Sequence, residues 1–249
     1  MPIANDSKAD HAKVVPPGTS RADAGPLGVG KPAPGQHQRG HQLEVRRYGA
    51  FARVNHWVTA ISLILLAISG LSLFHPSLFF LTALFGGGQN TRALHPWIGV
   101  VLFFSFALLV IQFWRANIPR REDAVWLSKI TDVLANREEN LPELGKYNAG
   151  QKFIFWSMTA LIVALIVSGV IIWDQYFYGA TAIETKRYAV ITHAVLAVVI
   201  ISIWIMHVYA SIWVQGTMSA MISGRVTGGW AWRHHRKWLR DLVRSKGVA

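Results

Sequence analysis

The chain has 249 residues, of which 52% are hydrophobic and only 15% are charged, and its formal net charge is +12. This composition, with a positive mean hydropathy, is typical of a membrane protein with several spans and argues against a soluble domain. The chain contains no cysteine, which excludes disulfides, thiolate-held iron–sulfur clusters and c-type haem attached through a Cys-x-x-Cys-His motif.

The first segment, residues 1–45, is rich in Pro, Gly, Ala and Lys and has no apolar periodicity, which predicts a disordered cytoplasmic tail. It has no apolar segment of the signal-peptide type, so we expect the first span itself to direct insertion. Four later stretches of about 20 residues are long enough to cross a hydrocarbon core about 30 Å thick. They are roughly 54–74, 94–114, 153–173 and 189–214. The predicted fold class is an all-α membrane protein with a four-helix transmembrane bundle over residues 46–224 and a basic tail over 225–249.

The connections differ in charge. The first is short and rich in glycine, the second is a polar loop over 115–152, and the third is short, over about 174–187. Of the 25 lysines and arginines, 22 lie in the N-terminal segment up to Arg53, the 115–152 loop and the C-terminal tail. Because basic loops stay in the cytoplasm, both termini are predicted to be cytoplasmic, and nucleic acid is not an expected partner. The basic aromatic segment 230–238 is expected either to lie on the anionic inner leaflet or to be solvated.

Four histidines fall inside the predicted spans: His56, His95, His193 and His207. An ionisable side chain at membrane depth is costly unless it faces a partner or a cavity, so each is a functional candidate. For any one alone, a hydrogen bond between helices is an equal alternative. Since successive spans run in opposite directions, His56 and His207 are expected near the cytoplasmic face, and His95 and His193 near the outer face. The four residues therefore form two level pairs.

The fourth span carries one member of each pair. His193 and His207 are 14 residues apart, which is a rise of about 21 Å and a return to within about 40° of the same direction. This arrangement suits two haems, one above the other, each iron taking one imidazole from the fourth span and one from another helix. Two imidazoles fill both axial positions of an iron, which favours electron transfer over the binding of oxygen or substrate.

Other residues carry weaker signals. Gly70 and Gly99 lie on the histidine-bearing faces, where they either make room for a flat macrocycle or serve helix packing. His75 is expected at the membrane interface, with His95 preferred over it as the outer ligand. The tail histidines are expected to be solvated: His11, His37, His41, His234 and His235.

Five motifs occur in order along the chain: Arg53-Val54-Asn55-His56-Trp57, Leu94-His95-Pro96, Gly145-Lys146-Tyr147-Asn148-Ala149-Gly150-Gln151-Lys152, Ser168-Gly169-Val170-Ile171-Ile172-Trp173 and His207-Val208-Tyr209. Together they closely resemble the cytochrome b556 (gamma) subunits of membrane-bound respiratory formate dehydrogenases. The resemblance runs from about Arg46 to the C-terminal tail, and residues 1–45 lie outside it.

This resemblance implies two b haems, the outer bound by His95 and His193 and the inner by His56 and His207, the same pairs that depth predicts. It also implies a quinone site beside the inner haem, formed by Asn148, Gly150 and His207. Capping or loop folding is the alternative role for Asn148. No catalytic residue for formate oxidation is expected in this chain.

The resemblance further implies partners in the bacterial inner (cytoplasmic) membrane. In this family a catalytic alpha subunit with molybdenum or tungsten oxidises formate, and an iron–sulfur beta subunit passes the electrons on. The chain has neither cysteines nor a soluble domain for these steps. We expect electrons to enter at the outer haem, cross to the inner haem and reduce menaquinone or ubiquinone. Family complexes include trimers of heterotrimers, and one chain reveals no interface for that assembly.

Three other functions remain open: a cytochrome b subunit of a hydrogenase or thiosulfate reductase, a haem-free membrane anchor, and a small transporter with a histidine proton relay. The 145–152 motif favours formate dehydrogenase among the cytochromes. The chain lacks the internal repeat common in transporters, and an anchor gives no reason for two level pairs of histidines.

Overall fold

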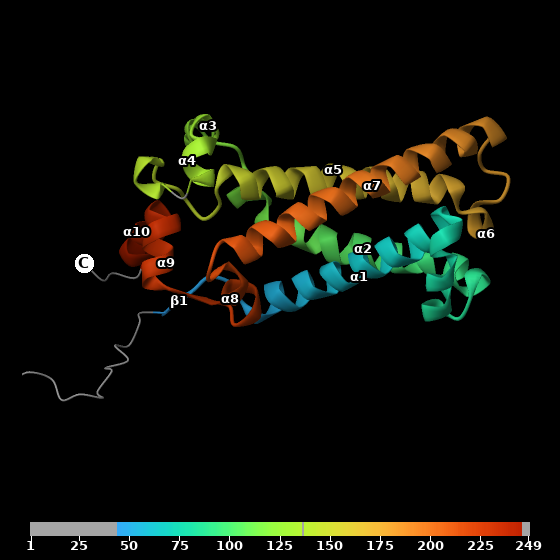
Figure 1. The fold of residues 1–249 in the computed structure, drawn as a ribbon, viewed down its shortest axis with the longest axis horizontal. Coiled ribbons are helices and arrows are strands. Elements are labelled where there is room, and N and C mark those ends of the chain that lie inside the picture. The colour runs from blue at the N-terminus through green and yellow to red at the C-terminus, as the bar shows by residue number, and fades with distance from the viewer. Residues whose placement is uncertain (1–43, 136, 246–249) are drawn as a thin grey trace, which may run out of the picture. The chain divides into compact units, whose positions relative to one another are not determined.

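The computed structural model describes residues 44–135 and 137–245, which belong to one compact unit, Gln42–Ala249. Within the described residues four helices are long and apolar enough to cross a membrane (Figure 1). They are α1 (Ala50–Phe74), α2 (Gly88–Phe113), α5 (Ala149–Ile172) and α7 (Ile183–Trp213). The four predicted spans are thereby confirmed, and each helix starts four to six residues before the predicted limit.

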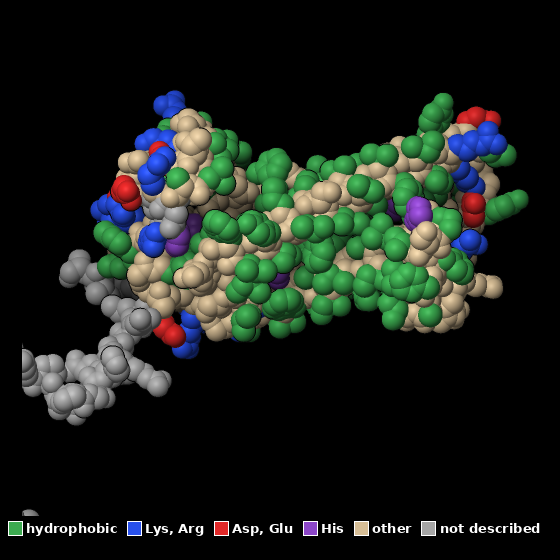
Figure 2. All heavy atoms as spheres, viewed as in Figure 1, with side chains coloured by type: hydrophobic (Ala, Val, Ile, Leu, Met, Phe, Trp, Pro, Cys, Tyr) green, Lys and Arg blue, Asp and Glu red, His purple; other side chains and the backbone are tan. Residues whose placement is uncertain are grey.

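The long helices bury little of their apolar surface inside the protein. In the most apolar stretch of 18 residues in α7, only 11% is buried inside the protein, and large residues such as Val195 and Ile205 are exposed. Hydrophobic side chains cover the flanks of the helices, whereas charged side chains gather at their two ends (Figure 2). A helix satisfies its backbone hydrogen bonds internally, so such apolar flanks are stable against lipid. The protein is a multi-pass membrane protein.

The four helices form two hairpins. Helix α1 packs along α2 and α5 along α7, with fewer close backbone contacts between the two hairpins. The first hairpin is closed by a 3-10 helix, η1 (Pro76–Phe85), where the sequence predicted only a glycine-rich loop. Gly86 and Gly87 follow η1 with φ angles of 82° and 100°, a conformation that glycine adopts without strain. The second hairpin is closed through α6 (Asp174–Phe177).

The predicted polar loop between the hairpins is folded. It contains η2 (Trp114–Asn117), α3 (Arg121–Ser128), α4 (Ile130–Leu134) and η3 (Glu138–Asn140). Trp126, Leu144 and Ala149 form a small buried cluster. A buried ion pair of 2.7 Å between Lys152 Nζ and an Asp123 carboxylate oxygen fastens α3 to the start of α5.

Segments from both ends of the chain meet beside this loop. Strand β1 (Glu44–Arg46) pairs antiparallel with β2 (Arg225–Thr227), with Val45 opposite Val226. The remaining elements are α8 (Thr217–Ile222), α9 (Gly228–His234) and α10 (Arg236–Ser245). Of the predicted N-terminal tail, Glu44 and Val45 lie in a strand, and residues 1–43 lie outside the described residues.

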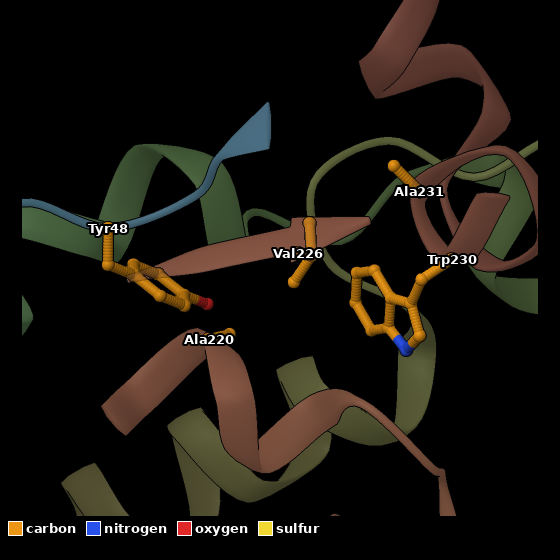
Figure 3. Packing of buried hydrophobic residues seen from close by; sticks show 5 residues of the cluster. All are labelled: Tyr48, Ala220, Val226, Trp230 and Ala231. Carbon is orange, nitrogen blue, oxygen red and sulfur yellow. The ribbon is translucent and has the colours of Figure 1, made fainter. Parts of the chain in front are cut away.

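A buried cluster joins these terminal segments: Tyr48, Ala220, Val226, Trp230 and Ala231 (Figure 3). Trp230 is only 9% exposed and Ala231 is fully buried. One side of the segment 230–238 is therefore packed against the protein, which a solvated tail would not be. Trp232 is 51% exposed, so contact of the other side with the inner leaflet stays a prediction.

Candidate functional site

The four histidines of the long helices lie in two pairs. The imidazole of His56 on α1 faces that of His207 on α7, with ring centroids 6.4 Å apart. The imidazole of His95 on α2 faces that of His193 on α7, with centroids 6.3 Å apart. These are the pairs expected from depth, and each pair links one hairpin to the other.

The spacing within each pair fits a shared metal ion. Since a metal–nitrogen bond to imidazole is about 2.0 Å long and the ring centre lies about 1.2 Å farther, two imidazoles on opposite sides of one ion have centres about 6.4 Å apart. Direct packing of two histidines has no such required distance. Among the described residues, no group of three or more His, Cys, Asp or Glu side chains gathers as a metal site. Two imidazoles from the protein are the ligand set that a haem iron takes in many b-type cytochromes.

Hydrogen bonds orient the outer pair for such binding. Nδ1 of His95 lies 2.7 Å from Ser69 Oγ, and the Ser69 hydroxyl donates to the Leu65 carbonyl at 2.7 Å. Because a hydroxyl has one proton, the bond to the Leu65 carbonyl leaves Ser69 Oγ as an acceptor toward His95, and this assigns the tautomer with the proton on Nδ1. Nε2 of His95 is then an unprotonated nitrogen, which is the form that binds a metal.

The same arrangement recurs on the other hairpin. Nδ1 of His193 lies 2.9 Å from Ser168 Oγ, and the Ser168 hydroxyl donates to the Ala164 carbonyl at 2.8 Å, which assigns the same tautomer to His193. The inner pair is different: Nδ1 of His56 is buried and has no hydrogen-bond partner among the described residues. The two pairs therefore share a spacing but differ in what supports their rings.

Glycines lie beside the outer imidazoles. A Cβ on Gly70 would lie 3.3 Å from Cε1 of His95, and one on Gly169 would lie 3.4 Å from Cε1 of His193. Both glycines thus let an imidazole approach the backbone of the neighbouring helix. At Gly99, a Cβ would meet no described atom within 4 Å, so the space there is open. Of the two glycines that the sequence singled out, Gly70 contacts a candidate ligand directly.

An apolar layer separates the two pairs. Leu63, Leu102, Met158, Ile162 and Ile200, which come from all four long helices, form one buried cluster. Ile200 is 2% exposed and lies seven residues from both His193 and His207. The layer therefore lies midway between the two levels of histidines.

The predicted quinone residues lie where α5 begins. Asn148 is the N-cap of α5: its Oδ1 accepts a 2.8 Å hydrogen bond from the Gln151 amide, and Gln151 Oε1 accepts a 3.1 Å bond from the Asn148 amide. A Cβ on Gly150 would lie 3.4 Å from the Trp126 indole and 3.5 Å from Asn148 Oδ1. The structure thus gives Asn148 the capping role that was its alternative, and it brings Gly150 against Asn148.

Two other histidines have definite places. His75 is exposed at the end of α1, where its Nδ1 accepts a 3.2 Å hydrogen bond from the Ser77 amide. The expectation that His235 is solvated is wrong, because His235 is 1% exposed. Its Nδ1 donates to the Gly145 carbonyl at 2.8 Å, and its Nε2 lies 3.2 Å from an Arg47 guanidinium nitrogen. His11, His37 and His41 lie outside the described residues.

The sequence analysis did not single out Ser69, Ser168 or Gly169 as site residues. A signal was present, since each hairpin carries a Ser-Gly pair, Ser69-Gly70 and Ser168-Gly169, in an otherwise apolar stretch. No comparable local signal exists for His235, because its partners Arg47 and Gly145 are remote in the sequence.

Comparisons with known proteins identify a family and several relatives. The profile of the family described as "Prokaryotic cytochrome b561" matches residues 47–224. The cytochrome b556(fdo) subunit of formate dehydrogenase from Escherichia coli K12 is 42% identical over 199 residues, which are 80% of this chain and 93% of that protein. The cytochrome b556(Fdn) subunit of the nitrate-inducible enzyme from the same strain is 39% identical over 194 residues, 78% of this chain and 89% of that protein. The formate dehydrogenase cytochrome b556 subunit of Haemophilus influenzae is 36% identical over 206 residues, 83% of this chain and 87% of that protein.

Proposed function

Because the chain belongs to the prokaryotic cytochrome b561 family and is a cytochrome b membrane-anchor subunit of formate dehydrogenase, we propose that it carries electrons through two b haems to a quinone. The observation that carries this proposal is the pair of histidine contacts, with ring centroids 6.3 and 6.4 Å apart on either side of an apolar layer.

Haem b supplies one-electron chemistry when it is bound. In this chain His95 and His193 would hold the outer haem, and His56 and His207 would hold the inner one. With two imidazoles supplied by the protein at each site, the bound haem would carry electrons and would not bind oxygen or substrate. The apolar layer around Ile200 keeps water away from the path between the two levels.

Electrons would enter at the level of His95 and His193 and leave at the level of His56 and His207. The end of the long helices that carries β1, α10 and the 115–152 loop is the cytoplasmic one, in a bacterial inner membrane, because its segments hold most of the basic residues. An inward-moving electron then travels against the membrane potential, at about 2.3 kcal/mol per 100 mV. Part of the redox energy between formate and quinone is thereby stored as membrane potential.

Menaquinone or ubiquinone is reduced beside the inner pair, at Asn148, Gly150 and His207, with protons taken from the cytoplasm. The family resemblance of the 145–152 motif supports this site. The cap uses only Oδ1 of Asn148, which leaves the Nδ2 protons to donate to a quinone carbonyl.

The electrons come from other subunits. The chain has no cysteine for an iron–sulfur cluster, and its relatives are named as subunits of formate dehydrogenase. The partners are an iron–sulfur subunit, which delivers electrons to the outer haem, and a catalytic subunit with molybdenum or tungsten, which oxidises formate.

Haem counting on ligand variants tests the proposal. A pyridine haemochrome assay on the purified complex is expected to give two b haems per chain, and one haem for His207→Ala or His193→Ala. The double variant His56→Ala/His207→Ala is expected to keep one haem with the spectrum of His207→Ala, because both residues bind the same iron. His75→Ala is the control and is expected to keep two.

Two results would contradict the proposal. A folded wild-type complex without b haem would remove the electron-transfer function altogether. If His56→Ala and His207→Ala removed different haems, the pairing of ligands would be wrong.

A further inference from the structure

We infer that Ser69 and Ser168 are positioning residues that lower the midpoint potential of the outer haem below that of the inner haem. This inference rests on the proposed function, since it needs a haem between His95 and His193. It assigns to the two serines a task that no apolar residue of the same size can perform.

The geometry is a relay of two hydrogen bonds on each side of the outer site. On α1 the relay runs from His95 Nδ1 to Ser69 Oγ and on to the Leu65 carbonyl, with both distances 2.7 Å. On α5 it runs from His193 Nδ1 to Ser168 Oγ and on to the Ala164 carbonyl, at 2.9 and 2.8 Å. Since each hydroxyl donates to its own helix, it presents a lone pair to the imidazole, and the two bonds polarise each other.

Both serines are shielded from competing water. Ser69 is completely buried and Ser168 is 5% exposed. Each is followed by a glycine, Gly70 or Gly169, against which the same imidazole packs. A Ser-Gly pair thus provides an acceptor for Nδ1 and room for Cε1, and it occurs once for each outer ligand.

The inner site lacks this support on at least one ligand. Nδ1 of His56 is buried with no hydrogen-bond partner among the described residues. The two sites therefore differ in the electronic state of their imidazoles, although their ring spacings are nearly equal, 6.3 and 6.4 Å.

This difference acts on the metal. A ligand imidazole that donates its Nδ1 proton to an acceptor becomes a stronger electron donor through Nε2. A stronger donor stabilises the oxidised iron more than the reduced iron, so the midpoint potential falls. Two supported ligands at the outer site therefore make the outer haem the better reductant of the two.

The direction of this asymmetry suits the path of the electrons. Transfer from the outer to the inner level opposes the membrane potential. A lower potential at the outer site provides a downhill step that offsets this cost. The serines thus favour inward transfer without contacting either iron.

Redox titration of the purified complex, followed optically, tests the inference. In Ser69→Ala and Ser168→Ala the outer potential is expected to rise, more in the double variant, while the inner potential and the two haems per chain are unchanged. His207→Ala, which retains only the outer haem, identifies the outer potential. Ser72→Ala is the matched control: Ser72 is 1% exposed on the same helix, but its hydroxyl donates only to the Ser69 carbonyl. It is expected to shift neither potential.

If the alanine variants lose the outer haem, their potentials cannot be measured, so a second set of variants is needed. Ser69→Cys and Ser168→Cys keep nearly the same volume but provide only a weak acceptor. They are expected to retain both haems and to raise the outer potential by less than alanine does. Two haems with unchanged potentials in both cysteine and alanine variants would overturn the inference and leave the proposed function standing. A wild-type complex without two haems would instead refute the proposed function.

Discussion

The side chain of Asn148 has two polar ends with different tasks. Its Oδ1 caps α5 by accepting from the Gln151 amide, whereas the proposed contact with quinone uses Nδ2. A simple truncation to alanine removes both at once. Residues with the same acceptor but no amide donor separate the two tasks.

We expect Asn148→Asp to keep the cap and lose the donor, since aspartate is as good an N-cap as asparagine and its carboxylate has no proton to donate. The rate of quinone reduction should fall by about tenfold, the effect of one lost hydrogen bond, with both haems and the melting temperature retained. Asn148→Ala should show the same fall in rate and also lose about 1 kcal/mol of stability. Quinol formation and thermal unfolding of the purified complex measure the two effects. An aspartate variant with the wild-type rate would reduce Asn148 to a cap.

At the scale of elements, the C-terminal helices α9 and α10 are held by buried polar contacts. His235 bridges the Gly145 carbonyl and Arg47, and Arg47 also donates to the Lys146 carbonyl at 2.5 Å. The Arg47 guanidinium lies 5.0 Å from the ring centroids of both Trp230 and Trp238. Because His235 donates through Nδ1 and accepts through Nε2, only its neutral form satisfies both partners.

Burial, reinforced by the nearby Arg47 charge, lowers the pKa of His235 from 6.5 to about 3. A lowered histidine pKa means that docking of α9 and α10 is fully stable above pH 6.5 and weakens as the pH falls toward 3. At pH 5 the loss should be about 2 kcal/mol. Hydrogen exchange of α9 and α10 at pH 7 and pH 5, corrected for intrinsic rates, measures it. His235→Asn keeps a donor for the Gly145 carbonyl but cannot be protonated. The exchange protection of α9 and α10 should therefore change much less between pH 7 and pH 5 in this variant than in the wild type. An equal change in the variant and the wild type would exclude His235 as the cause.

At the scale of the whole chain, the charges are divided between the two ends of the long helices (Figure 2). Segments at the end with β1, β2 and α10 carry most of the lysines and arginines, whereas the opposite connections carry Arg92, Lys186 and Arg187. This asymmetry predicts one orientation in the membrane.

Reporter fusions check the orientation. Alkaline phosphatase, which becomes active only outside the cytoplasm, should be inactive when fused after Ser245 and active when fused after Gly179. A cytoplasmic fluorescent reporter should give the opposite pattern at both positions. Phosphatase activity at Ser245 would place the termini outside and reverse the proposed direction of electron transfer.

The sequence by itself determined the number of spans, the level of each histidine and the stripe shared by His193 and His207. These features follow from the length of apolar stretches and the rise of a helix, which are local properties. It also contained the family motifs. It did not reveal the folded 115–152 loop or the packing of segment 230–238, because polar composition does not distinguish a solvated segment from one packed against distant partners. It also did not reveal η1, an apolar stretch of 10 residues that is too short to cross a membrane.

Only the tertiary structure decided which side chains support the ligands. Each of these contacts joins residues that are distant in the sequence. Ser69 and His95 are 26 residues apart, Ser168 and His193 are 25 apart, and Arg47 and His235 are 188 apart. Such contacts depend on how helices rotate about their axes and on which hairpin packs beside which. Helix rotation and the pairing of hairpins depend on the packing of the whole bundle, whereas hydropathy and periodicity are properties of a single helix.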